Sequence, residues 1–134
     1  MGYAISSTLL ARLLAEAKDS PGFEVCGLLF GAPGDIGARI EAAEACANVA
    51  AEPARAFEIE PGALFAAYRR ARAGGPVVIG HYHSHPSGEP VPSARDAAQA
   101  MGDGALWLIL TSDEGRLWRS VEVGRFEEVG LEVG

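Results

Sequence analysis

The chain has 134 residues, 49% of them hydrophobic and 22% charged, a balance typical of a folded protein whose length suits a single domain over residues 1–134. Its formal net charge of −7 leaves no basic surface for phosphate backbones, so we expect no nucleic-acid partner. No apolar run approaches the roughly 20 residues that span a bilayer, and the first residues lack a signal-peptide pattern, so we expect a cytoplasmic protein without a membrane partner.

The first part of the chain predicts a helix followed by a hairpin. Residues 6–18 form an amphipathic helix behind a serine cap, because apolar residues recur there at helical spacing: Leu9, Leu10, Leu13, Leu14 and Ala17. Residues 23–31, FEVCGLLFG, are an apolar run of strand length with Glu24 near its start, and they predict a central strand. Residues 31–37 are typical of a hairpin connection. Residues 38–48 fit helix or strand, and their place after a hairpin favours a strand.

The middle of the chain predicts a strand, a helix and a second buried strand. Residues 56–60, AFEIE, alternate in polarity as a short strand does. Pro61 then opens a helix over residues 61–73, which two glycines end. Residues 76–85 begin as a buried strand and continue into a histidine-rich stretch, so we expect this strand to carry the histidines to one end of the sheet.

The last part predicts a short helix and further strands. Ser93 caps a helix over residues 93–101, with Asp96 at its third helical position. Residues 105–123 predict two strands joined by a turn, and residues 124–134 predict an edge strand. Together these elements predict an α/β or α+β fold in which helices flank a mixed β-sheet.

The cysteine content argues against both a disulfide framework and a structural zinc site. The chain contains Cys26 and Cys46, which are too few for a disulfide-rich domain and lack Cys-x-x-Cys spacing. We expect both to be small buried hydrophobic residues. A nucleophilic Cys26 activated by a histidine is the functional alternative.

All three histidines lie in one segment, residues 80–96, GHYHSHPSGEPVPSARD. Residues two apart on a strand project from the same face, so His81, His83 and His85 point the same way. At roughly 3.3 Å per residue, His83 and His85 are about 7 Å apart along the backbone and their rings can converge, whereas His81 and His85 are about 13 Å apart. A zinc ion can therefore bind His83 and His85 but not all three, and we expect His81 to pack or to support the site.

A third metal ligand must come from outside this row. Asp96 is the best-placed carboxylate, because a proline-bearing loop can bring the following helix back over the end of the strand. Two nitrogens and one oxygen leave a tetrahedral zinc with one open position, which is the pattern of a catalytic site. Water bound there has its pKa lowered to near 7, so hydrolysis of an amide or related acyl bond is the natural chemistry.

Hydrolysis also requires a general base that is not itself a ligand. Glu24, on the edge of another central strand, is the candidate that the sheet can carry alongside the metal. Glu89 competes for this role but lies in a loop expected to be mobile. The Ser93 hydroxyl can stabilise the oxyanion of a tetrahedral intermediate.

These residues resemble the signature of the JAMM zinc metalloproteases, also called the MPN-plus or JAB family. The resemblance consists of a distant glutamate, Glu24, followed by HSHP, a loop, and the segment PSARD, and it spans roughly residues 23–111. It implies that one zinc ion per chain is bound by three residues and that two others are catalytic: His83, His85 and Asp96 for zinc, Glu24 as general acid/base, and Ser93 to polarise the scissile carbonyl.

The resemblance also implies a fold and a substrate class. The JAB/MPN fold is a curved mixed sheet flanked by helices, similar to that of cytidine deaminase. The implied activity is hydrolysis of a peptide or isopeptide bond after the C-terminal Gly-Gly of a ubiquitin-like or sulfur-carrier protein. The chain departs from the pattern at His81, where relatives often carry tryptophan, and it has no room for the long insertions of eukaryotic relatives. The oligomeric state stays open, with a homodimer among the arrangements.

Other interpretations of the same residues exist. The chain can be a noncatalytic scaffold or interaction module of MPN type, although all five motif positions are present. A nucleobase deaminase would need His-x-Glu and Pro-Cys-x-x-Cys, and the chain has neither. Ser93 and Asp96 also match a helix capping box, and we expect an aspartate bound to zinc to be unable to serve that cap fully.

Overall fold

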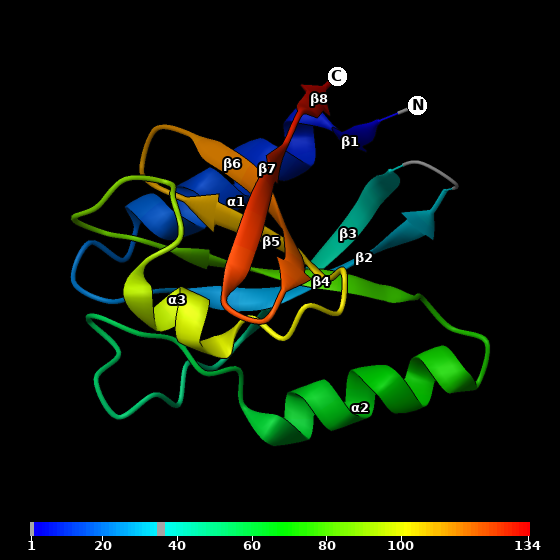
Figure 1. The fold of residues 1–134 in the computed structure, drawn as a ribbon, viewed down its shortest axis with the longest axis horizontal. Helices are drawn as coiled ribbons and strands as arrows, with labels where there is room; N and C mark the ends of the chain where they lie inside the picture. Colours follow the sequence, from blue (N-terminus) through cyan, green and yellow to red (C-terminus); the bar gives the residue numbers. More distant parts are fainter. Residues whose placement is uncertain (1, 35–36) are drawn as a thin grey trace.

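The computed structural model describes residues 2–34 and 37–134. Its elements in chain order are β1 (Tyr3–Ile5), α1 (Ser7–Lys18), β2 (Cys26–Pro33), β3 (Ala38–Cys46), α2 (Pro61–Arg72), β4 (Val78–Ser84), α3 (Ala94–Gln99), β5 (Leu106–Leu110), β6 (Gly115–Glu122), β7 (Arg125–Val129) and β8 (Leu131–Val133). Figure 1 shows them as a layered arrangement of strands and helices.

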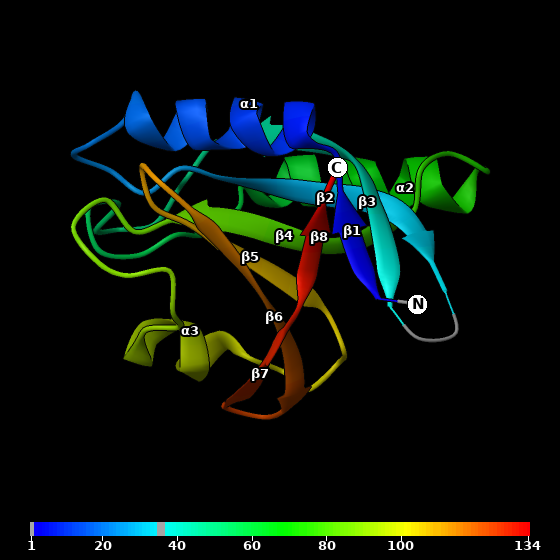
Figure 2. The same ribbon diagram turned by 90° about the horizontal axis from the view of Figure 1, so that it is seen from above.

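The strands form one mixed sheet in the order β7-β6-β5-β4-β2-β3-β1-β8. β4 runs parallel to β5, and β1 runs parallel to both β3 and β8, while the other neighbours are antiparallel. β7 and β8 lie at opposite ends of this order although only Gly130 separates them in the chain. The sheet is therefore strongly curved, so that its two ends approach each other (Figure 2). This confirms the predicted curved mixed sheet flanked by helices.

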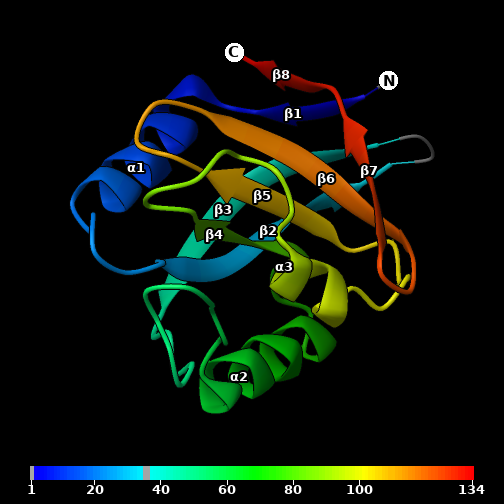
Figure 3. The same cartoon turned by 60° about the vertical axis from the view of Figure 1, so that its left-hand side comes forward.

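The helices cover the two faces of the sheet. Leu13 of α1 is buried against Leu29 and Tyr82, which point to one face. On the other face, Ala67 of α2 packs with Leu28 of β2. α3 follows the loop after β4 and lies between α2 and the β6–β7 hairpin in the view of Figure 3. The histidines of β4 share the face of Leu28, because Leu28 is paired with His81 in the sheet register.

Local signals in the sequence account for the helices and most strands. The Ser6 side chain accepts a hydrogen bond from the Leu9 amide at 3.1 Å and starts α1, and proline occupies the first turn of α2, as predicted. The expected strands over β2, β3, β4, β5 and β6 are present, and the β2–β3 pairing is antiparallel as a hairpin requires. Residues 35–36 of the predicted hairpin turn lie outside the described residues.

Three predictions of secondary structure were wrong. Residues 56–60 are not a strand: among the described residues their one bridge is the isolated antiparallel pair of Ile59 with Asn48, which itself lies outside the strands. The end of the chain forms two strands, β7 and β8, instead of one, and β8 pairs with an unpredicted strand, β1. Glu24 precedes β2 instead of lying within it, because that strand begins at Cys26.

None of the helices in residues 2–34 and 37–134 is both long enough and apolar enough to cross a membrane.

Candidate metal centre

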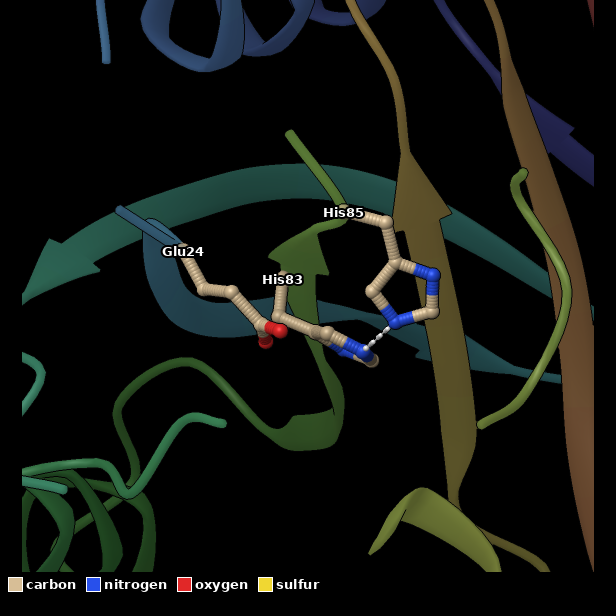
Figure 4. Close-up of side chains that lie close together, drawn as sticks. All are labelled: Glu24, His83 and His85. Atoms are coloured by element: carbon tan, nitrogen blue, oxygen red, sulfur yellow. Dashed lines mark hydrogen bonds between the residues drawn. The ribbon is translucent and has the colours of Figure 1, made fainter. Parts of the chain in front are cut away.

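Strand β4 divides its side chains between the two faces of the sheet. Tyr82 is fully buried in the core beneath α1, and its hydroxyl donates to Glu16 of that helix at 2.7 Å. His83 is also fully buried, but on the opposite face, and His85 follows it just beyond the end of the strand. The Nε2 atoms of His83 and His85 are 3.0 Å apart (Figure 4). The predicted convergence of these two rings is therefore present.

Asp96 brings a carboxylate to the same point. It is the third residue of α3, and its Oδ2 lies 3.1 Å from His85 Nε2 and 3.2 Å from His83 Nε2. Ligand atoms of a tetrahedral zinc with bonds of about 2.0–2.1 Å are about 3.4 Å apart. Two nitrogens and one oxygen thus surround a point at almost the spacing that zinc requires, so this group of residues fits a divalent metal.

Glu24 lies beside this cluster. One of its carboxylate oxygens and one ring nitrogen from each of His83 and His85 lie within 4.8 Å of one another, and all three residues are buried. In Figure 4 the Glu24 side chain points toward the two imidazoles. Its Oε1 is buried and has no hydrogen-bond partner among the described residues. Such an atom is costly to bury unless a proton, a water or a metal meets it.

Ser93 and Asp96 form a complete capping box at the start of α3. The Ser93 hydroxyl accepts a hydrogen bond from the Asp96 amide at 3.1 Å, and the Ser93 amide donates to Asp96 Oδ2 at 2.9 Å. Asp96 serves this cap while its Oδ2 also faces the histidines, and the expectation that an aspartate bound to zinc cannot serve the cap fully stays a prediction. One oxygen, Oδ2, faces both the Ser93 amide and the histidines, because a carboxylate oxygen has two lone pairs.

His81 does not join the cluster. Its ring packs edge-on against Trp107, with centroids 4.4 Å apart, and lies 5.5 Å from the ring of Phe57. Burial, and to a lesser extent the charge of His83, lower the pKa of His81 to about 3, so this ring stays neutral. His81 thus belongs to an aromatic cluster with Phe57 and Trp107, and not to the group formed by His83, His85 and Asp96.

The family model for prokaryotic homologs of the JAB domain matches residues 6–122. The chain belongs to this family. The match includes the segment of Glu24 and the whole segment from His83 to Asp96.

Two relatives of this JAB-domain chain are named desampylase. That of Haloferax volcanii is 37% identical over 128 residues, which are 94% of this chain and 89% of the relative. That of Pyrococcus furiosus is 28% identical over 123 residues, or 91% of this chain and 84% of the relative. The solution structure of a protein from Desulfitobacterium hafniense superposes with a TM-score of 0.84 at 23% identity, covering 98% of this chain and 92% of that one. This last likeness concerns the fold alone.

The two carboxyl groups at the JAB-domain site, those of Glu24 and Asp96, have pKa values shifted in opposite directions. Burial raises the pKa of Glu24 to about 7, partly offset by the charge of His85. Burial also opposes ionisation of Asp96, but hydrogen bonds from His83, His85 and the Ser93 amide hold its pKa well below the usual range. Asp96 therefore stays a carboxylate, whereas Glu24 exchanges a proton near neutral pH.

The two histidines have different surroundings on their second ring nitrogens. His85 Nδ1 donates to the Glu89 carbonyl at 2.8 Å, and its Nε2 donates to Asp96, contacts that raise the pKa of this ring against the effect of burial. Once Nε2 gives up its proton, its lone pair is directed at the cluster. The Glu89 side chain is exposed, so this residue contributes its backbone and not a carboxylate. Burial lowers the pKa of His83, and its Nδ1 has no partner among the described residues. A neutral imidazole is the form that binds metals.

Cys26 does not have the environment of an activated nucleophile. It is fully buried, and burial together with the nearby Cys46 thiol raises its pKa to about 12. The alternative of a cysteine nucleophile is thereby disfavoured. Cys26 packs as a small hydrophobic residue, as predicted, while Cys46 is only partly buried.

Two residues near the JAB-domain site were missed from the sequence. Phe57 stacks on His83 and Asn48 binds the backbone of Glu24. The alternation of polar and apolar residues over 56–60 is the signal that could have found Phe57, but it was interpreted only as a short strand. Asn48 is the last residue of the segment predicted as a strand over residues 38–48, and no local signal in the sequence distinguishes it.

Proposed function

We propose that the chain is a zinc-dependent JAMM-type metallopeptidase or isopeptidase that cleaves the bond after the C-terminal Gly-Gly of a ubiquitin-like or sulfur-carrier protein. The observation that carries the proposal is the convergence of three potential ligand atoms at 3.0–3.2 Å, beside the buried carboxyl group of Glu24, whose Oε1 has no hydrogen-bond partner among the described residues. The desampylase name of two relatives supports the substrate class, since it refers to conjugates of SAMP, a ubiquitin-like protein.

In this proposal His83, His85 and Asp96 hold one zinc ion. Asp96 is favoured over Glu24 as the third ligand because its Oδ2 lies within hydrogen-bond distance of both ring nitrogens, at 3.1 and 3.2 Å, whereas Glu24 makes no such contact with either ring among the described residues. Zinc held there would lower the pKa of a water molecule and polarise the scissile carbonyl. Asp96 contributes a permanent negative charge, and the histidines contribute neutral nitrogens.

Glu24 moves the proton. Its pKa of about 7 allows it to accept a proton from the attacking water and to return it to the leaving nitrogen within the same catalytic cycle. The burial of Oε1 without a partner in the described part of the chain leaves that atom available for the transfer. Glu89 is a poor competitor, because its side chain is exposed.

Ser93 polarises the substrate carbonyl in this scheme. Its hydroxyl oxygen accepts from the Asp96 amide, which fixes the oxygen in place and leaves the hydroxyl proton free to donate. A donor held in this way stabilises the negative charge that develops on the carbonyl oxygen. The capping geometry thus supports the proposed role and does not compete with it.

We also propose the substrate type, the location and the assembly of this enzyme. The substrate is a protein, and neither nucleic acid nor membrane is needed for the reaction. We place the enzyme in the cytoplasm, with residues 1–134 acting as one domain. A homodimer remains one arrangement compatible with the chain.

Metal content and cleavage together test the proposal. Purified wild type is expected to contain about one zinc per chain and His83→Ala to contain almost none. Glu24→Gln is expected to keep zinc but to lose hydrolysis of a conjugate in which a ubiquitin-like protein ending in Gly-Gly is joined to a lysine side chain. Zinc-loaded wild type that cleaves no such conjugate would instead favour the noncatalytic scaffold. Normal cleavage by Glu24→Gln would remove Glu24 from its proposed role.

A further inference from the structure

The segment between β3 and α2, residues 47–60, is attached to the backbone of Glu24 on both sides. The Glu24 amide donates to the Pro53 carbonyl at 2.8 Å. The Glu24 carbonyl accepts from Nδ2 of Asn48 at 2.9 Å. Glu24 precedes β2 and so lacks the regular sheet pairing that holds His83. Its backbone position is set instead by this segment.

Asn48 uses its whole amide group for this attachment. Nδ2 also donates to the Ala56 carbonyl at 3.0 Å, and Oδ1 accepts from the amides of Ala50 and Glu58, each at 3.0 Å. Only a carboxamide of this length offers two donors and two acceptor lone pairs in one plane. The side chain therefore connects the turn of the segment to Glu24 in a single fixed geometry.

A contact with β4 completes the attachment on the other side. The Val25 amide donates to the Ser84 hydroxyl at 2.9 Å, and the Ser84 amide donates to the Val25 carbonyl at 3.0 Å. Ser84 lies between His83 and His85 in the chain, so the backbone of Glu24 and Val25 is held at a fixed distance from both. On the opposite side, the Asn48 side chain holds the same stretch of backbone through its hydrogen bond to the Glu24 carbonyl.

The carboxylate of Glu24 depends on this backbone support. Its buried oxygen Oε1 has no hydrogen-bond partner in the described residues, so no polar contact at that atom fixes the side chain. A shift of the Glu24 backbone therefore passes directly to the carboxylate. Displacement of a reacting group by about 1 Å can lower a rate by about 100-fold.

We propose that Asn48 is a positioning residue for Glu24, which sets the distance between its carboxylate and the cluster of His83, His85 and Asp96. The proposal rests on the proposed function for the part played by Glu24 in proton transfer. Asn48 acts through the Glu24 carbonyl and has no contact with substrate in this scheme. It should therefore affect the chemical step and not zinc binding or substrate affinity.

Asn48→Asp tests this with little change in size. Aspartate keeps the acceptor that faces Ala50 and Glu58 but cannot donate to the carbonyls of Glu24 and Ala56. We expect zinc content to stay near that of wild type, KM to change less than about threefold, and kcat to fall at least tenfold. Hydrogen exchange at the Glu24 amide should become faster by at least tenfold, because its acceptor Pro53 lies in the loosened segment.

Ser120→Ala is the matched control. Ser120 is fully buried, and its hydroxyl likewise accepts a loop amide, that of Gly102, at 2.8 Å. This variant should lose comparable stability but keep wild-type kcat and slow exchange at Glu24. Asn48→Ala serves as a second variant if Asn48→Asp does not fold.

The outcomes separate this inference from the proposed function. A folded Asn48 variant with wild-type kcat, or with slow exchange at Glu24, overturns the inference while leaving the enzyme proposal intact. A fall in kcat that only matches the loss of zinc also overturns it. If zinc-loaded wild type cleaves no conjugate, the proposed function fails, and the exchange rate at Glu24 still decides whether Asn48 holds this segment.

Discussion

The ring of Phe57 lies face to face with the imidazole of His83, with centroids 4.1 Å apart and planes inclined by 17°. Phe57 is buried and comes from the segment between β3 and α2, not from the sheet. Its ring covers the flat side of an imidazole whose Nδ1 has no partner in the described part of the chain. Packing therefore orients the His83 ring, whereas metal-binding histidines in general are oriented by a hydrogen bond from the second ring nitrogen.

Phe57→Leu should weaken zinc binding. Leucine keeps the site apolar but cannot stack, so His83 gains freedom to rotate and zinc affinity should fall about tenfold. Competition with a chromophoric chelator measures this. Phe126→Leu is the control, because Phe126 packs on Trp107 in the same aromatic cluster and should leave affinity within about twofold. Equal losses in the two variants would show that the stack is not specific to His83.

The dual contacts of Asp96 predict a separation of metal binding from helix capping. Asp96→Asn keeps an oxygen for the Ser93 amide but loses the charge, so zinc affinity should fall strongly while α3 remains capped. Ser93→Ala should do the reverse, with zinc retained and stability lowered by about 0.5–2 kcal/mol. Zinc titration and urea unfolding measure the two effects. Loss of zinc in Ser93→Ala would contradict this separation.

The raised pKa of Glu24 predicts a pH-dependent stability in the metal-free protein. The folded state keeps the Glu24 proton up to about pH 7, whereas the unfolded state releases it near the ordinary pKa of 4.5. The free energy of unfolding is therefore unaffected by this shift below pH 4.5, falls as the pH rises from 4.5 to 7, and is lowered by the full amount above pH 7. Glu24→Gln should therefore match wild type near pH 4.5 and be more stable at pH 8, by on the order of 3 kcal/mol.

Urea unfolding of metal-free protein across this pH range provides the measurement. Glu41→Gln on β3 is the control, because Glu41 is exposed and its substitution removes no buried carboxyl group. A flat difference for Glu24→Gln would mean that the Glu24 carboxyl is not desolvated in the folded protein.

Gly27→Ala should destabilise the sheet. A Cβ at this position would meet the ring of Tyr82 and the carbonyl of Glu44, so Tyr82 must move from its bond to Glu16. Forced repacking of this kind costs about 1–3 kcal/mol. Gly22→Ala is the control, since a Cβ there has nothing within 4 Å. Thermal and urea unfolding should show a loss only for Gly27→Ala.

Period-two geometry was sufficient to predict much of the candidate site. The alternation along β4 predicted that His83 and His85 converge and that His81 does not, and the capping pattern predicted where Asp96 starts α3. Strand alternation and helix capping both depend on residues close together in the chain, so a single sequence is enough to apply them. The ligand and catalytic roles of these residues stay predictions.

Tertiary contacts account for what the sequence did not predict. The pairing of β1 with β8 joins two three-residue segments more than a hundred residues apart, and neither segment is long enough to show a period. The alternation of residues 56–60 is typical of a strand, but it arises because Phe57 packs on His83. The attachment of Asn48 to Glu24 likewise exists only after the chain has folded.

The division of β4 between the two faces of its sheet has a consequence for mutational tolerance. Tyr82 and Ser84 belong to the interior beneath α1 and to the link with Val25, while His83 and His85 belong to the candidate metal centre. In a saturation library of residues 82–85, a screen for soluble expression should reject changes at the even positions. A screen for zinc-dependent turnover should additionally reject changes at the odd positions, His83 and His85. Neighbouring codons of this segment would therefore be under different kinds of selection.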